Sequence, residues 1–328
     1  MKILYFTDTH IRGTTPQNRK DNLVETLEKK FNEVIGIINE ENIDYVIHGG
    51  DLFDRPDVSV SIVSKFAEIL NKIKVPIYIV SGNHDIYGHN PETLGKTMLG
   101  LLNAINILHV IDSGEKIILE KNGVKVQLTG QPYIYNLDDP INRDKYIIKS
   151  KPDNIKYLIH VVHGMLLDRP FIKGIPYTLI DDIKETKADI TLCGHYHSGF
   201  GIKIIDGKYF INPGSLIRIT NSVKEIERIP QVVIMDLSKK IDIKLVPLKT
   251  AQKGELILDR KEIENYMYKN ERLNEFKQSI DETVNFDKLD INKILSEISH
   301  TEGIKPQVKE EALRRIASSQ IKFSGDDI

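Results

Sequence analysis

The chain of 328 residues has a single cysteine, no tryptophan and almost no net charge, with 45 Lys and Arg against 47 Asp and Glu. The lone Cys193 excludes a disulfide framework and a zinc site built from cysteines. No apolar run reaches membrane-spanning length, and the opening MKILYFTDTH is too short for a signal peptide, so we expect a cytoplasmic protein without membrane contact. The near-zero charge excludes a globally basic surface, so any contact with nucleic acid would be local.

Short apolar runs alternate with amphipathic patterns in the first part of the chain. Residues 3–6, 45–47 and 77–80 are predicted strands, and two helices with apolar residues at 3–4 spacing lie between them. This order predicts parallel strands with right-handed crossovers. Residues 117–245 contain many more strands, with hairpin turns at Asn122-Gly123 and Asp206-Gly207. The sequence therefore predicts an α/β fold, a four-layer α-β-β-α sandwich of two mixed sheets flanked by helices.

The character of the chain changes near residue 250. We expect a first domain over residues 1–250 and a mostly helical, highly charged accessory region over residues 251–328. Apolar residues recur at helical spacing in this second region: Tyr266, Leu273, Phe276, Ile280, Leu289, Ile294, Leu295 and Ile298. They favour two alternatives equally, packing on the core or docking to a partner helix.

Side chains that can bind metals follow five predicted strands. The segments are Asp8-Thr9-His10, Gly49-Gly50-Asp51, Gly82-Asn83-His84-Asp85, His163-Gly164 and Gly194-His195-Tyr196-His197. Each alone is also a common turn fragment, but sites form where the carboxyl ends of parallel strands meet, and all five fall there. Mixed nitrogen and oxygen donors suit manganese, iron or zinc. Two Asp, one Asn and four His exceed the needs of one ion, so we expect two ions about 3.5–4 Å apart.

These five blocks, in this order, resemble the signature of the calcineurin-like metallophosphoesterases over roughly residues 1–250. The resemblance implies two divalent metal ions and a metal-bridging hydroxide that attacks phosphorus. It also implies roles for individual residues: Asp8, His10 and His197 on one metal, Asn83, His163 and His195 on the other, Asp51 between them, and His84 as a non-ligand proton donor. Asp85 would orient His84, or would only stabilise its turn.

Within that superfamily the chain is similar to DNA-repair nucleases of the SbcD type, through Asp8–Gly13, Gly50–Pro56 and Asn212–Arg218. This similarity implies exonuclease and endonuclease activity on DNA, manganese as the metal, a homodimer, and an SbcC-type coiled-coil ATPase as partner. Two features depart from that pattern. Asp54 replaces a histidine that archaeal and eukaryotic relatives usually carry. The region after residue 250 is short and has a helical pattern, so the β-containing cap expected there would be reduced or absent.

Two other functions stay open. The first is a metallophosphoesterase that acts on a small-molecule or phosphoprotein phosphoester, which the weak net charge leaves possible. The second is a binding scaffold with a silent metal site, which the intact set of seven ligands and His84 disfavours. The loop with Arg12, Arg19 and Lys20, next to Asp8, could hold a phosphate backbone or could simply be solvated.

Overall fold

In the computed structural model the chain divides into two compact units, Met1–Arg260 and Lys261–Ile328. The structure describes residues 1–172, 174–220 and 222–259 of the first unit, and residues 305, 307, 308, 311, 312 and 315 of the second. The apolar stripe that we expected over residues 266–298 lies outside the described residues. Ala251 packs on the core of the first unit, and α5 (Gly254–Ile257) is also part of it. The boundary near residue 250 stays a prediction.

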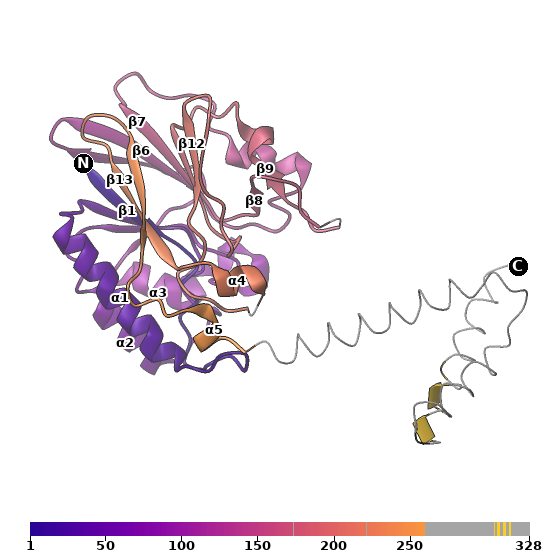
Figure 1. Cartoon of the computed structure of the whole chain (residues 1–328). Coiled ribbons are helices and arrows are strands. Elements are labelled where there is room, and N and C mark those ends of the chain that lie inside the picture. Colours follow the sequence, from indigo (N-terminus) through magenta and orange to yellow (C-terminus); the bar gives the residue numbers. More distant parts are fainter. Residues whose placement is uncertain are drawn as a thin grey trace, which may run out of the picture. The chain divides into compact units, whose positions relative to one another are not determined.

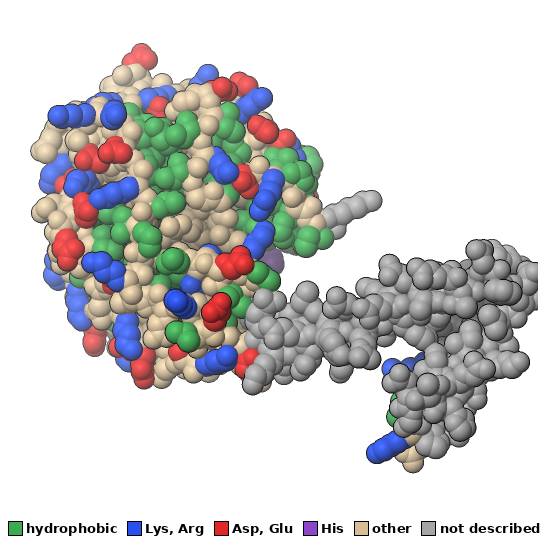
Figure 2. Space-filling model, in the orientation of Figure 1, with side chains coloured by type: hydrophobic (Ala, Val, Ile, Leu, Met, Phe, Trp, Pro, Cys, Tyr) green, Lys and Arg blue, Asp and Glu red, His purple; other side chains and the backbone are tan. Residues whose placement is uncertain are grey.

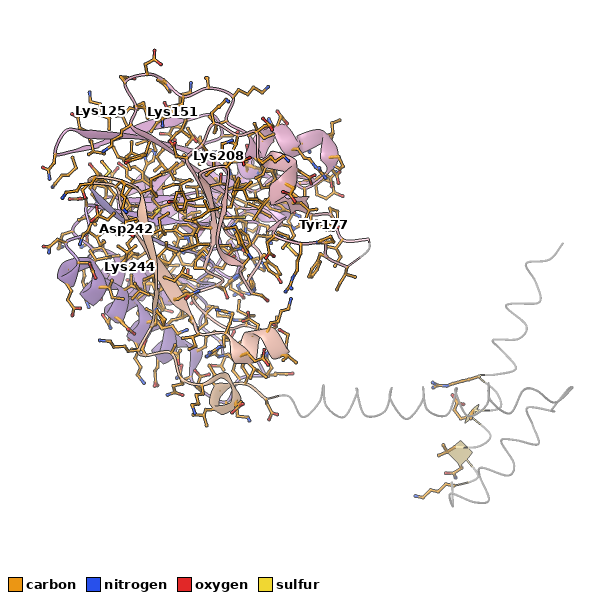
Figure 3. All side chains as sticks on the ribbon, turned by 45° about the horizontal axis from the view of Figure 1, so that its top comes forward. Lys125, Lys151, Tyr177, Lys208, Asp242 and Lys244 are labelled. Carbon is orange, nitrogen blue, oxygen red and sulfur yellow. The ribbon has the colours of Figure 1, made fainter. Side chains whose placement is uncertain are left out.

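The first sheet has six strands in the order β14-β13-β1-β2-β3-β4. Four of them are parallel neighbours, and β13 and β14 complete the sheet as antiparallel strands. The strands span β1 (Lys2–Phe6), β2 (Tyr45–His48), β3 (Ile77–Ile79), β4 (His109–Val110), β13 (Gln231–Asp236) and β14 (Asp242–Pro247). The edge strand β14 carries the charged Asp242 and Lys244 (Figure 3), which discourages pairing with another chain.

The second sheet also has six strands, in the order β11-β12-β10-β7-β6-β5. Its four central strands run parallel, and the two edge strands pair antiparallel with their neighbours through the hairpins expected from the sequence. The strands span β5 (Lys116–Lys121), β6 (Val124–Gln131), β7 (Tyr157–Val162), β10 (Ile190–Cys193), β11 (Gly201–Ile205) and β12 (Lys208–Asn212).

Helices connect the parallel strands of the first sheet and cover its outer face (Figure 1). They are α1 (Leu23–Glu40), α2 (Val60–Leu70) and α3 (Met98–Ala104). In α1 the Asn22 side chain accepts hydrogen bonds from the amides of Val24 and Glu25, which satisfies donors that a helix start leaves free. Leu23, Leu27 and other apolar residues of the same face are buried against the sheet.

The outer face of the second sheet is covered by short elements: η3 (Pro140–Tyr146), η4 (Ile180–Ile183), and the strand pair β8 (Leu166–Leu167) and β9 (Thr178–Leu179). Tyr177, labelled in Figure 3, belongs to the loop before β9. The remaining elements are η1 (Tyr87–His89), η2 (Pro91–Lys96) and α4 (Val223–Glu227).

The described residues form three apolar cores. One lies between the helices and the first sheet, another between the two sheets, and the third between the second sheet and its outer layer of short elements.

The four-layer sandwich predicted from the sequence is therefore confirmed, with 3₁₀ helices rather than α-helices in the outer layer of the second sheet. Among the described residues, no helix has the length and apolar character needed to cross a membrane. Basic, acidic and hydrophobic side chains are interspersed on the face shown in Figure 2, in keeping with the small net charge.

Candidate metal centre

The loops after β1, β2, β3, β7 and β10 meet at one rim, where the carboxyl ends of strands from both sheets come together. Among the described residues, three groups of side chains have possible ligand atoms within 4.8 Å of one another, and two of these groups consist only of predicted ligands. The first group is Asp8, His10, Asp51 and His197, and the second is Asp51, His163 and His195. The remaining group is His10, Asp54 and His84. Asn83 joins the second group, because its Oδ1 lies 3.3 Å from His163 Nε2. The structure thus brings all seven predicted ligands together, with Asp51 in both groups.

The backbone reaches this arrangement through an uncommon conformation. Asp8, His10, Asp51 and His195 have positive φ angles of 53°, 44°, 54° and 70°. Residues with a β-carbon rarely adopt this left-handed region, and where it occurs the surrounding structure must hold it. Hydrogen bonds between the loops do so here, since the Asp8 amide donates to the Gly50 carbonyl over 3.1 Å and the His10 amide to the Asp51 carbonyl over 3.0 Å.

Hydrogen-bond donors hold both carboxylates, and they leave one oxygen free in Asp51. Asp8 accepts from the His195 amide at 3.1 Å and from the Thr7 hydroxyl at 2.7 Å. Asp51 Oδ1 accepts from the His84 amide at 2.9 Å. Asp51 Oδ2 is buried without a hydrogen bond, 3.3 Å from His163 Nε2 and 3.7 Å from His10 Nε2. An unsatisfied buried carboxylate oxygen between two histidine groups is suited to bridge two cations.

The histidines also present lone pairs to the same region. His163 Nδ1 donates to the Gly49 carbonyl over 2.7 Å, which leaves Nε2 as the ligand atom. A hydrogen bond of this kind fixes the tautomer and orientation of many metal-bound histidines. The Nε2 atoms of His10 and His197 lie 3.1 Å apart, so both point at a common position.

Burial keeps two of these rings neutral, as metal ligation requires. It lowers the pKa of His10 well below its ordinary value and that of His195 to about 3. Burial would also lower the pKa of His163, but the charge of Asp51 raises it to about 9. Burial raises the pKa of Asp51, and the positive charge of His163 more than offsets this and holds it well below its usual range. A divalent cation here would supply the positive charge that the proton on His163 otherwise provides, so the residues fit a metal.

Two glycines allow this close packing. A β-carbon on Gly50 would lie 2.3 Å from His163 Nδ1, and one on Gly82 would lie 2.0 Å from Asp51 Oδ1. Both distances are far below van der Waals contact, and Gly50 also has a φ of +102°. Any side chain at these positions would displace a candidate ligand.

His84 lies at the edge of the first group, with its ring 4.8 Å from the His10 ring. Its Nδ1 donates to the Asp54 carbonyl over 2.8 Å. The hydrogen bonds of Asp85 favour the second expectation, a residue that stabilises the turn, because its buried carboxylate accepts from the amides of Leu52, Phe53 and Gly82. Burial and the nearby charge of Asp51 raise the pKa of Asp85 to about 7. Asp85 thus ties two site loops together and does not contact the ring.

The sequence did not reveal the segment after β12 as part of this rim. The Ser215 amide donates to the His197 carbonyl over 2.9 Å, and the Leu216 amide donates to the Thr7 carbonyl over 3.0 Å. These bonds fix the chain on both sides of the first group. The Asn-Pro-Gly-Ser stretch at 212–215 was the only sign of this segment in the sequence, and it does not reveal which site loops the segment contacts.

Two basic side chains, the largely buried Arg228 and the buried Lys30, donate to carbonyls of that segment. Arg228 donates to the carbonyls of Ser215 and Ile217 over 2.6 and 3.0 Å, and it pairs with Glu225 at 2.5 Å. Lys30 donates to the Leu216 carbonyl over 2.6 Å.

Arg19, considered above as a phosphate ligand, belongs to the same buried network. It pairs with Asp21 at 2.7 Å and donates to the Arg218 carbonyl. Its buried side chain is therefore turned away from solvent. Arg12 remains nearer to the site, since its guanidinium contacts the Asp54 carboxylate at 3.0 Å.

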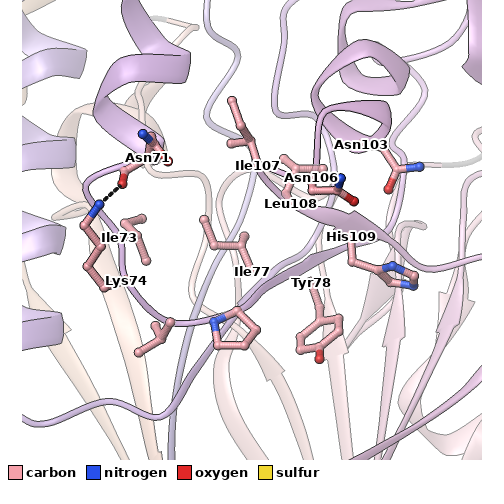
Figure 4. Close-up of a pocket in the computed structure, with 12 residues that line it drawn as sticks. Asn71, Ile73, Lys74, Ile77, Tyr78, Asn103, Asn106, Ile107, Leu108 and His109 are labelled. Carbon is pink, nitrogen blue, oxygen red and sulfur yellow. Dashed lines mark hydrogen bonds between the residues drawn. The ribbon is translucent and has the colours of Figure 1, made fainter.

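A separate pocket of about 450 Å³ lies at the amino ends of β3 and β4, away from these loops (Figure 4). Tyr78 and His109 line it, and their rings meet edge to face at 5.8 Å. Among the described residues, none of the seven candidate ligands lines this pocket.

A sequence model of the family described as "Calcineurin-like phosphoesterase" matches residues 1–199. This chain belongs to that family. The matched span runs past His197 and includes all seven candidate ligands together with His84. The resemblance predicted from the sequence is therefore confirmed, and the chain is a member of a phosphoesterase family, with residue groups that could hold metal ions.

Three curated proteins are similar to this chain at modest identity. The "DNA double-strand break repair protein Mre11" of Methanococcus maripaludis is 28% identical over 298 residues, covering 87% of this chain and 74% of that protein. The protein of that name from Sulfolobus acidocaldarius is 26% identical, covering 73% of this chain and 59% of that protein. The "Probable exonuclease subunit 1" of Escherichia phage T5 is 25% identical, covering 66% and 59%. The chain thus spans less than two thirds of the last two relatives.

Proposed function

We propose that this protein is a dinuclear-metal DNA nuclease that hydrolyses phosphodiester bonds. The observation that carries the proposal is the pair of ligand groups that share Asp51, whose Oδ2 is buried and has no hydrogen bond. Asp8, His10 and His197 would hold one ion, and Asn83, His163 and His195 the other. When bound, two divalent cations would neutralise charge on the phosphoester and lower the pKa of a water toward neutrality.

The protein's own residues would orient the substrate and supply a proton. His84 is anchored through Nδ1 to the Asp54 carbonyl, so its Nε2 is the nitrogen available to a phosphate oxygen or leaving group. Because the anchoring acceptor is a carbonyl, both the neutral ring and the protonated ring can keep this hydrogen bond. Asp85 would act indirectly, by joining the loop of His84 to the loop of Asp51.

DNA is the proposed substrate because the similar curated proteins are named for DNA break repair and exonuclease activity. The mixed nitrogen and oxygen donors support manganese as the metal, with iron or zinc as alternatives. A homodimer, an SbcC-type coiled-coil ATPase partner and a cytoplasmic location complete the proposal and stay predictions.

The direct test is a cleavage assay with purified protein. Linear duplex DNA, single-stranded DNA and a simple phosphodiester ester would be incubated with manganese, and each reaction repeated with a chelator. We expect manganese-dependent degradation of DNA. Efficient turnover of the ester with intact DNA would instead support a phosphoesterase that acts on another substrate.

A variant separates this activity from a contaminating nuclease. Asp51→Asn keeps the size of the side chain and an acceptor for the His84 amide, but it removes the charge shared by both groups. We expect this variant to lose DNA cleavage. The matched control is His109→Ala, which changes an exposed histidine at the far end of the first sheet and should leave cleavage intact.

A further inference from the structure

Tyr133 follows the end of β6, a strand end that carries no candidate metal ligand. Its amide donates to the Ser81 carbonyl over 2.9 Å, which ties it to the loop of Asn83 and His84. The ring lies against the second ligand group, with its centroid 5.7 Å from that of His195 and 6.4 Å from that of His163. Tyr133 is thus fixed beside the metal centre.

The contacts of this ring are not those of a core residue. The three apolar cores formed by the described residues do not include Tyr133. The ring is only half-buried, and no hydrogen bond of its hydroxyl is found within the described part of the chain. Among the described residues its aromatic contacts are all with histidines: His163 and His195 of the site, and the exposed His89 at the end of η1.

Aromatic side chains continue from Tyr133 toward solvent. The exposed His89 meets the Tyr133 ring edge to face at 5.3 Å, and it lies 6.5 Å from Tyr135 with the rings inclined by 36°. His89 also has a positive φ of 58°, an uncommon conformation for a residue with a β-carbon. Tyr135 is 69% exposed. Tyr133, His89 and Tyr135 therefore form an aromatic series that starts at the second ligand group and ends at the surface.

We propose that Tyr133, with His89 and Tyr135, forms a stacking site for the unpaired bases of a DNA strand whose phosphodiester lies at the metal centre. The proposal rests on the proposed nuclease function and names the part of the substrate recognised outside the phosphate. Proteins that bind single strands place successive bases on aromatic side chains, and every base has a face that can stack. A preference for single-stranded DNA follows, because both faces of a base inside a duplex are already covered by the neighbouring base pairs.

The test is a cycle that combines a change in the protein with a change in the substrate. Wild type and Tyr133→Leu would be assayed on a single-stranded oligonucleotide with a normal base next to the scissile phosphate, and on one with an abasic analogue there. We expect Tyr133→Leu to raise KM roughly 5- to 100-fold on the normal strand and to have little effect on the abasic strand. Equal losses on both strands would show that the ring does not recognise a base.

Two matched variants distinguish the ring from its surroundings. Tyr133→Phe keeps the ring and should retain wild-type KM, whereas a loss equal to that of Tyr133→Leu would assign the effect to the hydroxyl and overturn the proposal. Tyr78→Leu changes another half-buried tyrosine that contacts a histidine, in the pocket of Figure 4 at the opposite end of the sheet. It should have wild-type KM on both strands.

A binding measurement tests the stacking site without turnover. An oligonucleotide with 2-aminopurine at the same position would be titrated with manganese-loaded, catalytically weakened His84→Ala protein, since stacking quenches 2-aminopurine fluorescence. We expect quenching that the added Tyr133→Leu change abolishes and that Tyr133→Phe preserves. Quenching unchanged by Tyr133→Leu would overturn the stacking site. If quenching follows the proposal but wild type cleaves only simple esters, the nuclease function fails and the stacking site stands.

Discussion

His84 donates its Nδ1–H to the carbonyl oxygen of Asp54 over 2.8 Å. This bond is one of several that join the loop after β3 to the loop after β2, and it determines which ring nitrogen of His84 faces the rim. Because the acceptor belongs to the main chain, the His84 ring should keep its orientation whatever side chain stands at position 54. The Asp54 carboxylate contacts Arg12 at 3.0 Å and lies 3.7 Å from His10 Nδ1.

We expect His84→Ala to lower turnover roughly 10²- to 10⁴-fold, because it removes a proton donor while leaving all seven ligands in place. Metal content measured on the same preparation should match wild type. Normal turnover in this variant would remove His84 from the mechanism, and loss of metal would make it a ligand instead.

Metal should also stabilise the fold, because the ligands are brought together only in the native state. At a manganese concentration about 100 times the dissociation constant of one site, binding at that site contributes about 2.7 kcal/mol to the free energy of unfolding. This corresponds to a rise of roughly 5–10 °C in the melting temperature of a unit of this size. A thermal melt with and without manganese measures the shift. Asp51→Asn should show little or none, and a full shift in that variant would mean that the ions bind elsewhere.

The buried pair of Arg228 and Glu225 should stabilise the rim segment. Arg228→Met leaves the Glu225 carboxylate, only 2% exposed, without its main partner, and we expect a cost of roughly 3–5 kcal/mol in the free energy of unfolding. The double variant with Glu225→Gln should recover part of that loss, since no buried charge is then left unpaired. Denaturant unfolding compares the two, and equal stability of the single and double variants would contradict the pairing argument.

His160 gives the fold a defined sensitivity to acid. Burial lowers its pKa to about 4, below the ordinary 6.5, and the ring bonds to the Thr129 hydroxyl and the Lys145 carbonyl. The native state therefore resists a proton that the unfolded state accepts. The contribution of the neutral His160 ring to the free energy of unfolding is complete above about pH 6.5. It falls as the pH drops toward 4, and roughly 2 kcal/mol is lost at pH 5. The free energy of unfolding of His160→Gln, measured at pH 7.5 and at pH 5, should lack this part of the loss. The same pH dependence in the variant as in wild type would contradict the role of His160.

The rim of the site was predictable because strand order alone determines it. Once residues 3–6, 45–47 and 77–80 are parallel strands, their following loops must meet at one edge, whatever the details of packing. The loops after β7 and β10 belong to the second sheet, and their place at the same rim follows from the packing of two parallel arrays. The bridging position of Asp51 came from the family resemblance, and the structure supplies a physical reason for it in the unsatisfied Oδ2.

The direction of single side chains was not predictable. Asp85 is next to His84 in sequence, yet its carboxylate turns into the loop amides of Leu52, Phe53 and Gly82. Arg19 looks like a surface cation in sequence, but Asp21 and a nearby carbonyl draw it inward. In both cases main-chain groups distant in sequence decide the outcome.

Tyr133 was missed for a related reason. A tyrosine after a strand has no distinctive pattern, and its neighbours His89, His163 and His195 come from three separate segments of the chain. The one signal was that the strand β6 is followed by an aromatic residue, whereas its parallel neighbour β7 is followed by the candidate ligand His163.

Anomalous diffraction from crystals grown with manganese tests the central claim most directly. We predict two peaks about 3.5–4 Å apart, one between Asp8, His10, Asp51 and His197 and the other between Asp51, Asn83, His163 and His195, with the Asp51 carboxylate contacting both. A single peak, or peaks remote from Asp51, at saturating manganese would contradict the account.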